Sequence, residues 1–265
     1  MSFVLTETNY FSPDRPHISN SMVSDYVRSP EFYKKKYIDK IIPKKVSEPM
    51  KRGSLVDRIL TQGTNLPYRC KVLKRDDPDE FLEQKEVSDD LLLSTAYWNQ
   101  AQQISTDVLR SQIWNENLEE AEFQVLLKGE IDELPVCGMA DRIDRLGGQR
   151  YRLIDLKVVQ AQKVSSPSKW LHTCLDFGYL RQLALYQHLF ALDMKIPSEY
   201  VECGHIAAAY VEEGLTDVKA FTISQFALDA AFDEILAALS GIKMERFVSH
   251  ETSWQDAIQI GTTSE

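Results

Sequence analysis

The stretch GMADRIDRLGGQRYRLIDLK, residues 138–157, predicts the centre of the fold. Its two apolar halves are joined by a Gly-Gly pair, which adopts the positive φ angles of a tight turn at low steric cost. We therefore predict a hairpin of two β-strands. Because side chains alternate along a strand, Asp155 and Lys157 point to the same face, and Asp141 lies across the hairpin from them.

These charged side chains interrupt an otherwise hydrophobic hairpin. Burying two carboxylates and an ammonium group is costly unless they pair with one another or bind a cation. A divalent metal ion held by Asp141 and Asp155, with Lys157 beside it, would offset that cost. The alternative is an unrelated α/β domain in which Asp155 and Lys157 form only a surface ion pair, and the three side chains do not converge.

An acidic residue on one strand followed by D-x-K on the next resembles the core of the PD-(D/E)xK nuclease superfamily. Asp141 stands at the position of the first acid, and Asp155 and Lys157 are the ends of the D-x-K. Further along the chain, Gln182 and Tyr186 resemble the Q-x-x-x-Y helix of the RecB-like branch. D-x-K alone is a weak signal, but the combination in this order is specific.

Two upstream segments extend the resemblance. The segment RGSLVD, residues 52–57, resembles the helix that usually presents a histidine to the metal ion in the RecB-like branch, with Asp57 in place of the histidine. Residues 18–22 and 28–33 resemble the opening of RecE-like phage and prophage exonucleases. The resemblance spans roughly residues 17 to 210.

The resemblance implies an α/β fold with a PD-(D/E)xK restriction-endonuclease-like core, in which helices flank a mixed central β-sheet. We expect a single nuclease domain over residues 1–265, with a helical N-terminal region (1–62), an α/β core (63–243) and a tail (244–265). The implied function is a metal-dependent DNA exonuclease that acts from duplex ends in phage or prophage recombination or DNA processing. A homo-oligomer and a single-strand annealing partner are expected on the same basis. A catalytically inactive DNA-binding or assembly protein and a structure-specific endonuclease are the alternatives.

The resemblance also assigns roles to individual side chains. The predicted catalytic residues are Asp141, Asp155, Lys157, Gln182 and Tyr186. Asp141, Asp155 and the Leu156 carbonyl group would hold Mg²⁺ or Mn²⁺. Lys157 would orient the attacking water or offset charge on the phosphate, while Gln182 and Tyr186 would position that lysine, the water or the DNA strand.

Two further acidic residues are candidate metal ligands. Asp57 offers hard oxygen atoms that suit Mg²⁺ or Mn²⁺; its alternative role is to pair with a neighbouring arginine. In the superfamily a glutamate before the first strand sometimes joins the metal site, and Glu122 is the candidate here. Its alternative is a solvent-facing position at a strand edge.

The charge distribution is segregated along an acidic chain. The formal net charge is −10, yet residues 28–52 hold nine basic and three acidic side chains, and residues 76–90 hold eight acidic side chains and one lysine. A local basic surface that binds DNA can therefore coexist with an acidic whole. Both runs are also compatible with solvated helix faces. The candidate DNA-binding residues are Arg28, Lys51, Arg52, Lys163, Lys169 and Arg181.

Cysteine spacing and hydropathy bear on the compartment. The four cysteines are far apart in sequence, which argues against a zinc site or an iron–sulfur cluster. No apolar run approaches the roughly 20 residues of a membrane helix, and residues 1–16 lack the features of a secretory signal. We therefore expect a cytoplasmic protein that does not enter the membrane.

Periodicity predicts the remaining elements. Helices are expected over residues 19–27, 29–40, 49–62, 78–116 (with a break or bend), 176–194 and 222–241, and strands over 68–73, 119–128 and 199–211. Residues 158–175, rich in Ser, Gln and Lys, are predicted to be a connection. Its basic and aromatic side chains would contact phosphates or bases, or would form a surface loop without a function.

Overall fold

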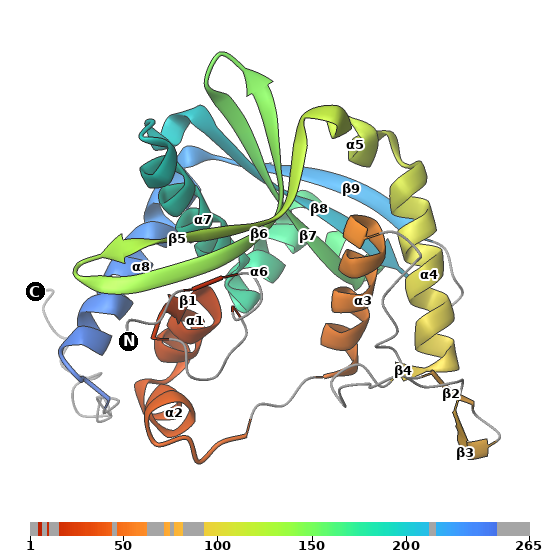
Figure 1. Ribbon diagram of the computed structural model, residues 1–265, viewed down its shortest axis with the longest axis horizontal. Coiled ribbons are helices and arrows are strands. Elements are labelled where there is room, and N and C mark those ends of the chain that lie inside the picture. Colours follow the sequence, from red (N-terminus) through yellow and green to blue (C-terminus); the bar gives the residue numbers. More distant parts are fainter. Residues whose placement is uncertain are drawn as a thin grey trace, which may run out of the picture.

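The computed structural model describes residues 5–6, 10, 16–43, 47–62, 72–74, 77–81, 93–211 and 216–247. A mixed sheet forms its centre, in the order β1-β6-β7-β8-β9 with β5 added along β6 (Figure 1). The strands are β1 (Ile18–Ser19), β5 (Ala121–Ile131), β6 (Leu134–Gly147), β7 (Arg150–Gln160), β8 (Val201–Tyr210) and β9 (Thr216–Ile223). Strand β7 runs parallel to β8 and antiparallel to β6.

Helices cover both faces of this sheet (Figure 1). They are α1 (Asn20–Arg28), α2 (Pro30–Tyr33) with a π-helical continuation (Lys34–Ile38), α3 (Glu48–Gln62), α4 (Thr95–Arg110), α5 (Gln112–Asn115), α6 (Pro167–Phe177), α7 (Tyr179–Met194) and α8 (Gln225–Lys243). Short strands β2 (Val72–Lys74), β3 (Asp77–Phe81) and β4 (Leu93–Ser94) form a separate three-stranded sheet. None of the described helices is both long and apolar enough to cross a bilayer.

Strand β7 is buried on both faces because two hydrophobic cores meet it. Leu153 packs in the core that contains α1, α7 and α8, with Leu183 at its centre. Ile154 points the opposite way, into the core of α3 and α4, where it joins Leu55 and Ile104. Alternation along one strand therefore distributes successive side chains between the two helical layers.

The predicted hairpin and fold class are confirmed. Gly147 and Gly148 have φ angles of 87° and 58° in the turn between β6 and β7. The predicted helix 49–62 is α3, and the predicted strand 199–211 is β8. Most of the predicted strand 68–73, most of the acidic run 76–90 and the tail from residue 248 lie outside the described residues.

The predicted connection 158–175 is wrong. Strand β7 continues to Gln160, and α6 occupies Pro167–Phe177. Ser166 caps α6 by accepting a hydrogen bond from the Lys169 N–H at 3.3 Å, and Gly178, at φ 70°, ends the helix. A serine cap followed by proline in the first turn, and a glycine after the last turn, are ordinary signals of helix boundaries. The sequence therefore contained enough local information to predict this helix.

Two other boundaries differ from the prediction. The predicted helix 78–116 is a strand, β3, at Asp77–Phe81 and becomes helical only from Thr95. Strand β9 was not predicted, and the helix expected from residue 222 begins at Gln225, after the Ser224 cap. Strand β9 pairs with β8, so its β-structure depends on a partner that a local pattern does not reveal.

Candidate active site

The predicted catalytic residues meet at the fork where β6 separates from β7. The backbone pairing of these strands ends at Arg142 and Ile154, and the next residues are Asp141 and Asp155. Beyond this point the Leu156 N–H donates a hydrogen bond to Asp141 Oδ2 at 2.8 Å. Beyond the end of the ladder, the Asp141 side chain thus takes the place of a backbone acceptor for β7.

A continuous chain of polar contacts runs from Asp155 to helix α7. Lys157 Nζ lies 2.5 Å from Asp155 Oδ2 and donates a hydrogen bond to Gln182 Oε1 at 2.9 Å. Gln182 Nε2 in turn donates to the Tyr186 hydroxyl at 3.0 Å. The structure therefore brings the D-x-K strand and the Q-x-x-x-Y helix into one network.

Close packing against β6 fixes Tyr186. A Cβ atom at Gly138 would lie 2.3 Å from the Tyr186 ring, so only glycine fits there. Gly138 is the first residue of the stretch that predicts the hairpin, and its role is to let the aromatic end of the network approach the sheet.

A third carboxylate comes from helix α3. Asp57 accepts hydrogen bonds from Gln124 Nε2 at both carboxylate oxygens, at 2.9 and 3.1 Å. Gln124 lies on β5 opposite Asp141, where the regular pairing of β5 with β6 is interrupted, and its φ angle is 52°. A left-handed conformation is unfavourable for a residue with a side chain, and here it accompanies a side chain that reaches the site. No local sequence pattern points to Gln124.

The electrostatics of the site disfavour three negative charges together. Burial, followed by repulsion from Asp155, raises the pKa of Asp57 to about 7. Burial and the neighbouring carboxylates Asp155 and Asp57 raise the pKa of Asp141 well above its ordinary value. Burial also raises the pKa of Asp155, against the opposing effect of Lys157. For Lys157 burial favours the neutral amine, but Asp155 and Asp141 outweigh it and raise its pKa.

The donor chemistry fits a hard divalent cation. Asp155 is fully buried, and neither of its carboxylate oxygens has a hydrogen-bond partner apart from its ion pair. Asp57, Asp141 and the Leu156 carbonyl would add further oxygen donors of the kind that Mg²⁺ and Mn²⁺ prefer. Within the described part of the chain, no three or more acidic, histidine or cysteine side chains are placed, as they stand, so that together they could hold a metal ion. In this arrangement Lys157 supplies the positive charge beside Asp155.

Glu122 is exposed on β5, and the residue of that strand that contacts Asp57 is Gln124. The exposure of Glu122 matches its alternative role, a solvent-facing position on the strand, and its assignment as a metal ligand stays a prediction.

Two predicted DNA contacts are instead structural. Arg52 is only 4% exposed, donates to the Tyr210 hydroxyl at 2.6 Å and also donates to Gln100, which fastens α3 to β8 and α4. The Arg181 side chain forms an ion pair with Glu234 of α8 at 2.6 Å. Because both guanidinium groups are engaged within the fold, we no longer assign either to DNA.

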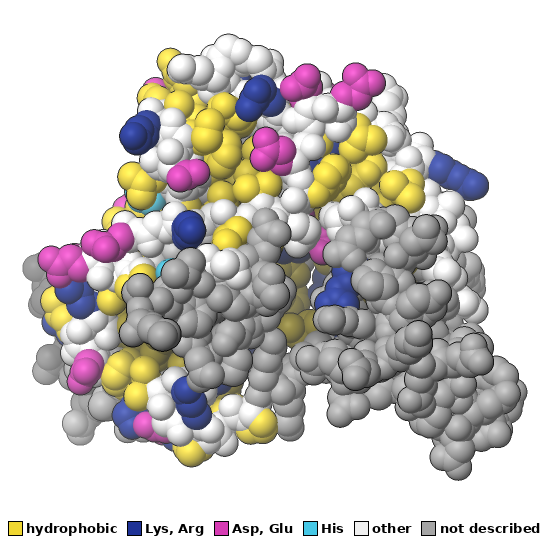
Figure 2. Space-filling view, in the orientation of Figure 1, with side chains coloured by type: hydrophobic (Ala, Val, Ile, Leu, Met, Phe, Trp, Pro, Cys, Tyr) yellow, Lys and Arg dark blue, Asp and Glu magenta, His cyan; other side chains and the backbone are white. Residues whose placement is uncertain are grey.

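The remaining candidates stay predictions. Arg28 and Lys169 are exposed, and Lys51 and Lys163 are half-buried. Elsewhere in the predicted basic run, ion pairs engage three lysines: Lys34 with Asp39, Lys35 with Glu31, and Lys36 with Asp25. Figure 2 shows basic, acidic and apolar side chains interspersed among the described residues of one face, without a continuous basic stripe there.

A buried histidine lies behind the site. His205 on β8 pairs in register with Asp155, and its Nε2 atom is 3.9 Å from Asp155 Oδ2. Burial and the positive charge of Lys157 lower the pKa of His205 to about 3, so its ring is neutral. Trp170, which the predicted loop placed at the surface, is buried and meets His205 edge-on at 5.3 Å. No sequence pattern predicted that His205 lies next to Asp155, because their proximity depends on the pairing of β7 with β8.

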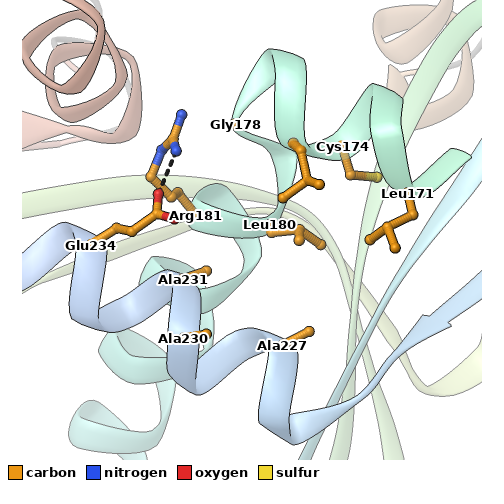
Figure 3. A pocket seen from close by; sticks show the side chains of 10 residues that line it. Leu171, Cys174, Gly178, Leu180, Arg181, Ala227, Ala230, Ala231 and Glu234 are labelled. Atoms are coloured by element: carbon orange, nitrogen blue, oxygen red, sulfur yellow. Dashed lines mark hydrogen bonds and ion pairs between the residues drawn. The ribbon is translucent and has the colours of Figure 1, made fainter. Parts of the chain in front are cut away.

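A separate pocket of about 240 Å³ opens between α6, α7 and α8. Its walls are mostly apolar, and the Arg181–Glu234 ion pair lies among the residues that line it (Figure 3). None of the predicted catalytic side chains lines it. The pocket therefore does not identify the site of the chemistry, which rests on the network at the fork.

Comparison with known proteins places this arrangement in a family. A crystal structure of a protein from Eubacterium rectale, described as a candidate exonuclease, superimposes with a TM-score of 0.66 at 18% identity, covering 97% of this chain and 94% of that chain. A second structure, of SSO0001, matches with a TM-score of only 0.33 at 12% identity over 84% of this chain and 77% of that one, which is too low to establish a common fold. No curated protein matches the sequence. The family model for the PDDEXK-like domain of unknown function DUF3799 matches residues 19–253, so the chain belongs to that family.

Proposed function

We propose that this protein is a Mg²⁺- or Mn²⁺-dependent deoxyribonuclease that hydrolyses phosphodiester bonds. The observation that carries the proposal is the network at the fork: Lys157 contacts Asp155 and Gln182, with Asp141 on the adjoining strand. A PDDEXK-like family match and the fold shared with the Eubacterium rectale protein support it.

The residues of the chain divide the work. Asp57, Asp141, Asp155 and the Leu156 carbonyl would hold the metal ion. When bound, the ion acts as a Lewis acid and lowers the pKa of a water molecule that it coordinates. Lys157, kept protonated by its carboxylate neighbours, orients that water or offsets negative charge on the phosphate. Gln182 accepts from the ammonium group and is itself held by Tyr186, which fixes the direction of Lys157.

We further propose that the protein is an exonuclease that acts at the ends of duplex DNA. The support for this assignment is the resemblance of residues 18–22 and 28–33 to RecE-like enzymes and the description of the Eubacterium rectale protein. A role in phage or prophage recombination, a homo-oligomeric state, a single-strand annealing partner and a cytoplasmic location accompany that assignment as proposals.

Metal binding can be tested separately from cleavage. A ligand that binds only the folded state raises its melting temperature, and a concentration one hundred times Kd contributes about 2.7 kcal/mol. We expect Mn²⁺ to raise the melting temperature of the wild type by roughly 5–10 °C, and this shift to disappear in Asp155→Asn. Asp193→Asn, at an exposed position of α7, is the control and keeps the shift. An equal shift in Asp155→Asn and the wild type would contradict the proposed metal site.

A further inference from the structure

A row of aromatic rings and cations connects the site to the surface. Lys157 Nζ lies 4.5 Å from the centre of the Tyr179 ring. Tyr179 stacks on Phe177, with the ring centroids 5.6 Å apart and the planes inclined by 22°. Lys163 Nζ lies 4.4 Å from the centre of the Phe177 ring. The row therefore leads in three contacts from the proposed catalytic lysine to a second lysine outside the site.

The outer ring of this row is accessible to solvent. Phe177 is 52% exposed, whereas Trp170 of the same helix is 2% exposed. Phe177 is the last residue of α6, and Gly178 turns the chain into α7 so that Tyr179 stacks on it. A Cβ atom at Gly178 would come within 2.7 Å of the Arg181 side chain and 2.8 Å of that of Ser24. Packing around the turn thus fixes an exposed aromatic surface beside the site.

We propose that Phe177 is a stacking platform for an unpaired nucleobase of the substrate strand. The inference rests on the proposed nuclease function, because it places a phosphate of the same strand at Lys157. Aromatic rings with neighbouring cations are the usual means of binding unpaired bases, since every base has a π face. The side chain of Lys163 is flexible. When the base binds, the ammonium group moves off the Phe177 ring and contacts the backbone phosphate. The substrate class is therefore DNA with unpaired nucleotides next to the cleaved bond, as at a frayed or single-stranded end.

Binding without cleavage tests the platform directly. The probe is a fluorescein-labelled oligothymidylate, and its anisotropy is measured in the presence of a chelator so that metal-dependent hydrolysis cannot occur. We expect Phe177→Leu to weaken binding roughly 5- to 150-fold, the range for loss of one stacked base. Phe177→Tyr, which keeps the ring, binds like the wild type. Phe226→Leu removes a ring that is 84% exposed on α8, and this control also binds like the wild type.

The position of the stacked base provides a second readout. A single abasic nucleotide is placed at successive positions of the oligonucleotide. We expect one position at which it weakens binding to the wild type as much as Phe177→Leu does. At that position it should not weaken binding to Phe177→Leu any further. Wild-type protein that does not bind the oligonucleotide, or Phe177→Leu that binds as tightly as wild type, would overturn the platform. Metal-dependent digestion of DNA by the same preparations would then leave the proposed nuclease function standing. If the preparations do not digest DNA but Phe177→Leu still weakens binding, the proposed nuclease function would be wrong and the proposed binding site would stand.

Discussion

At the scale of single residues, three carboxyl groups share one ammonium group at the fork between β6 and β7. Burial and mutual repulsion raise the pKa values of Asp57, Asp141 and Asp155. The proposed metal ion would bind the deprotonated groups, so it would compete with a proton at Asp57, whose pKa is about 7. Stability and metal binding are therefore both expected to depend on pH in the neutral range.

The pH dependence of stability tests Asp57. Its carboxyl group has a pKa of about 7 in the folded protein and about 3.9 in an unfolded chain. Between these values the folded state holds a proton that the unfolded state has lost, so the stability contributed by this group falls as pH rises and is lost above about 7. We expect the unfolding free energy of Asp57→Asn relative to wild type to increase over this window, measured by urea denaturation in a chelating buffer. A difference that does not change with pH would contradict the assignment.

Gln124 is expected to act on metal affinity through Asp57. Gln124→Gly keeps the left-handed backbone, which glycine adopts freely, and removes the amide that holds both carboxylate oxygens. Loss of a group that orients a metal ligand typically costs 10- to 100-fold in affinity, and we expect about tenfold, by calorimetric titration with Mn²⁺. The matched control is Gln149→Gly, at an exposed turn residue with φ 66°. Equal Mn²⁺ affinities for the two variants would refute this role.

At the scale of elements, the contact between α7 and β6 controls the network. In Gly138→Ala the new methyl group would overlap the Tyr186 ring, and such overpacking costs about 1–3 kcal/mol. We expect reduced stability together with reduced cleavage, because Tyr186 holds Gln182. Gly53→Ala is the comparison: nothing lies within 4 Å of the added atom in α3, so it should stabilise by about 0.5–1 kcal/mol. A Gly138→Ala protein as stable and active as wild type would refute the packing argument.

Arg52 joins elements rather than binding DNA. Arg52→Met leaves Gln100 and the Tyr210 hydroxyl without their donor, at about 1–3 kcal/mol for each unsatisfied group. Thermal unfolding should therefore shift to lower temperature, while the salt dependence of DNA binding stays as in wild type. In the adjacent variant Lys51→Met, loss of a phosphate contact would reduce the salt slope by about one unit. A reduced salt slope in Arg52→Met would restore Arg52 as a DNA contact.

The elements also show what local sequence can predict. The β6–β7 hairpin and α7 were predicted because their signals are local: a Gly-Gly turn, strand alternation and helical spacing. The Asp155–Lys157–Gln182–Tyr186 network was expected through the family motifs, and the structure shows its contacts. Gln124 and His205 were missed because their positions depend on strands distant in sequence. Gln124 lies where the pairing of β5 with β6 is interrupted, and His205 pairs in register with Asp155.

At the scale of the whole molecule, the acidic charge limits how the protein holds DNA. The net charge is −10, and ion pairs engage Lys34, Lys35 and Lys36 of the basic run. Four of the predicted DNA-binding residues stay as candidates: Arg28, Lys51, Lys163 and Lys169. Each neutralised phosphate contributes about −0.9 to the slope of log K against log salt concentration. We expect a slope no steeper than about −4 for duplex DNA, by anisotropy in a chelating buffer, and a steeper slope would show that further basic residues bind DNA.

The most direct test of the central claim is digestion of linear and closed circular duplex DNA with Mg²⁺ or Mn²⁺, comparing wild type with Lys157→Ala. We expect wild type to degrade the linear DNA and leave the circle intact, a chelator to stop the reaction, and Lys157→Ala to be inactive although it is folded. Nicking of the circle would make the protein an endonuclease on the same site. No metal-dependent cleavage of either DNA by folded wild type, or full activity of Lys157→Ala, would contradict the proposed role of the network at the fork.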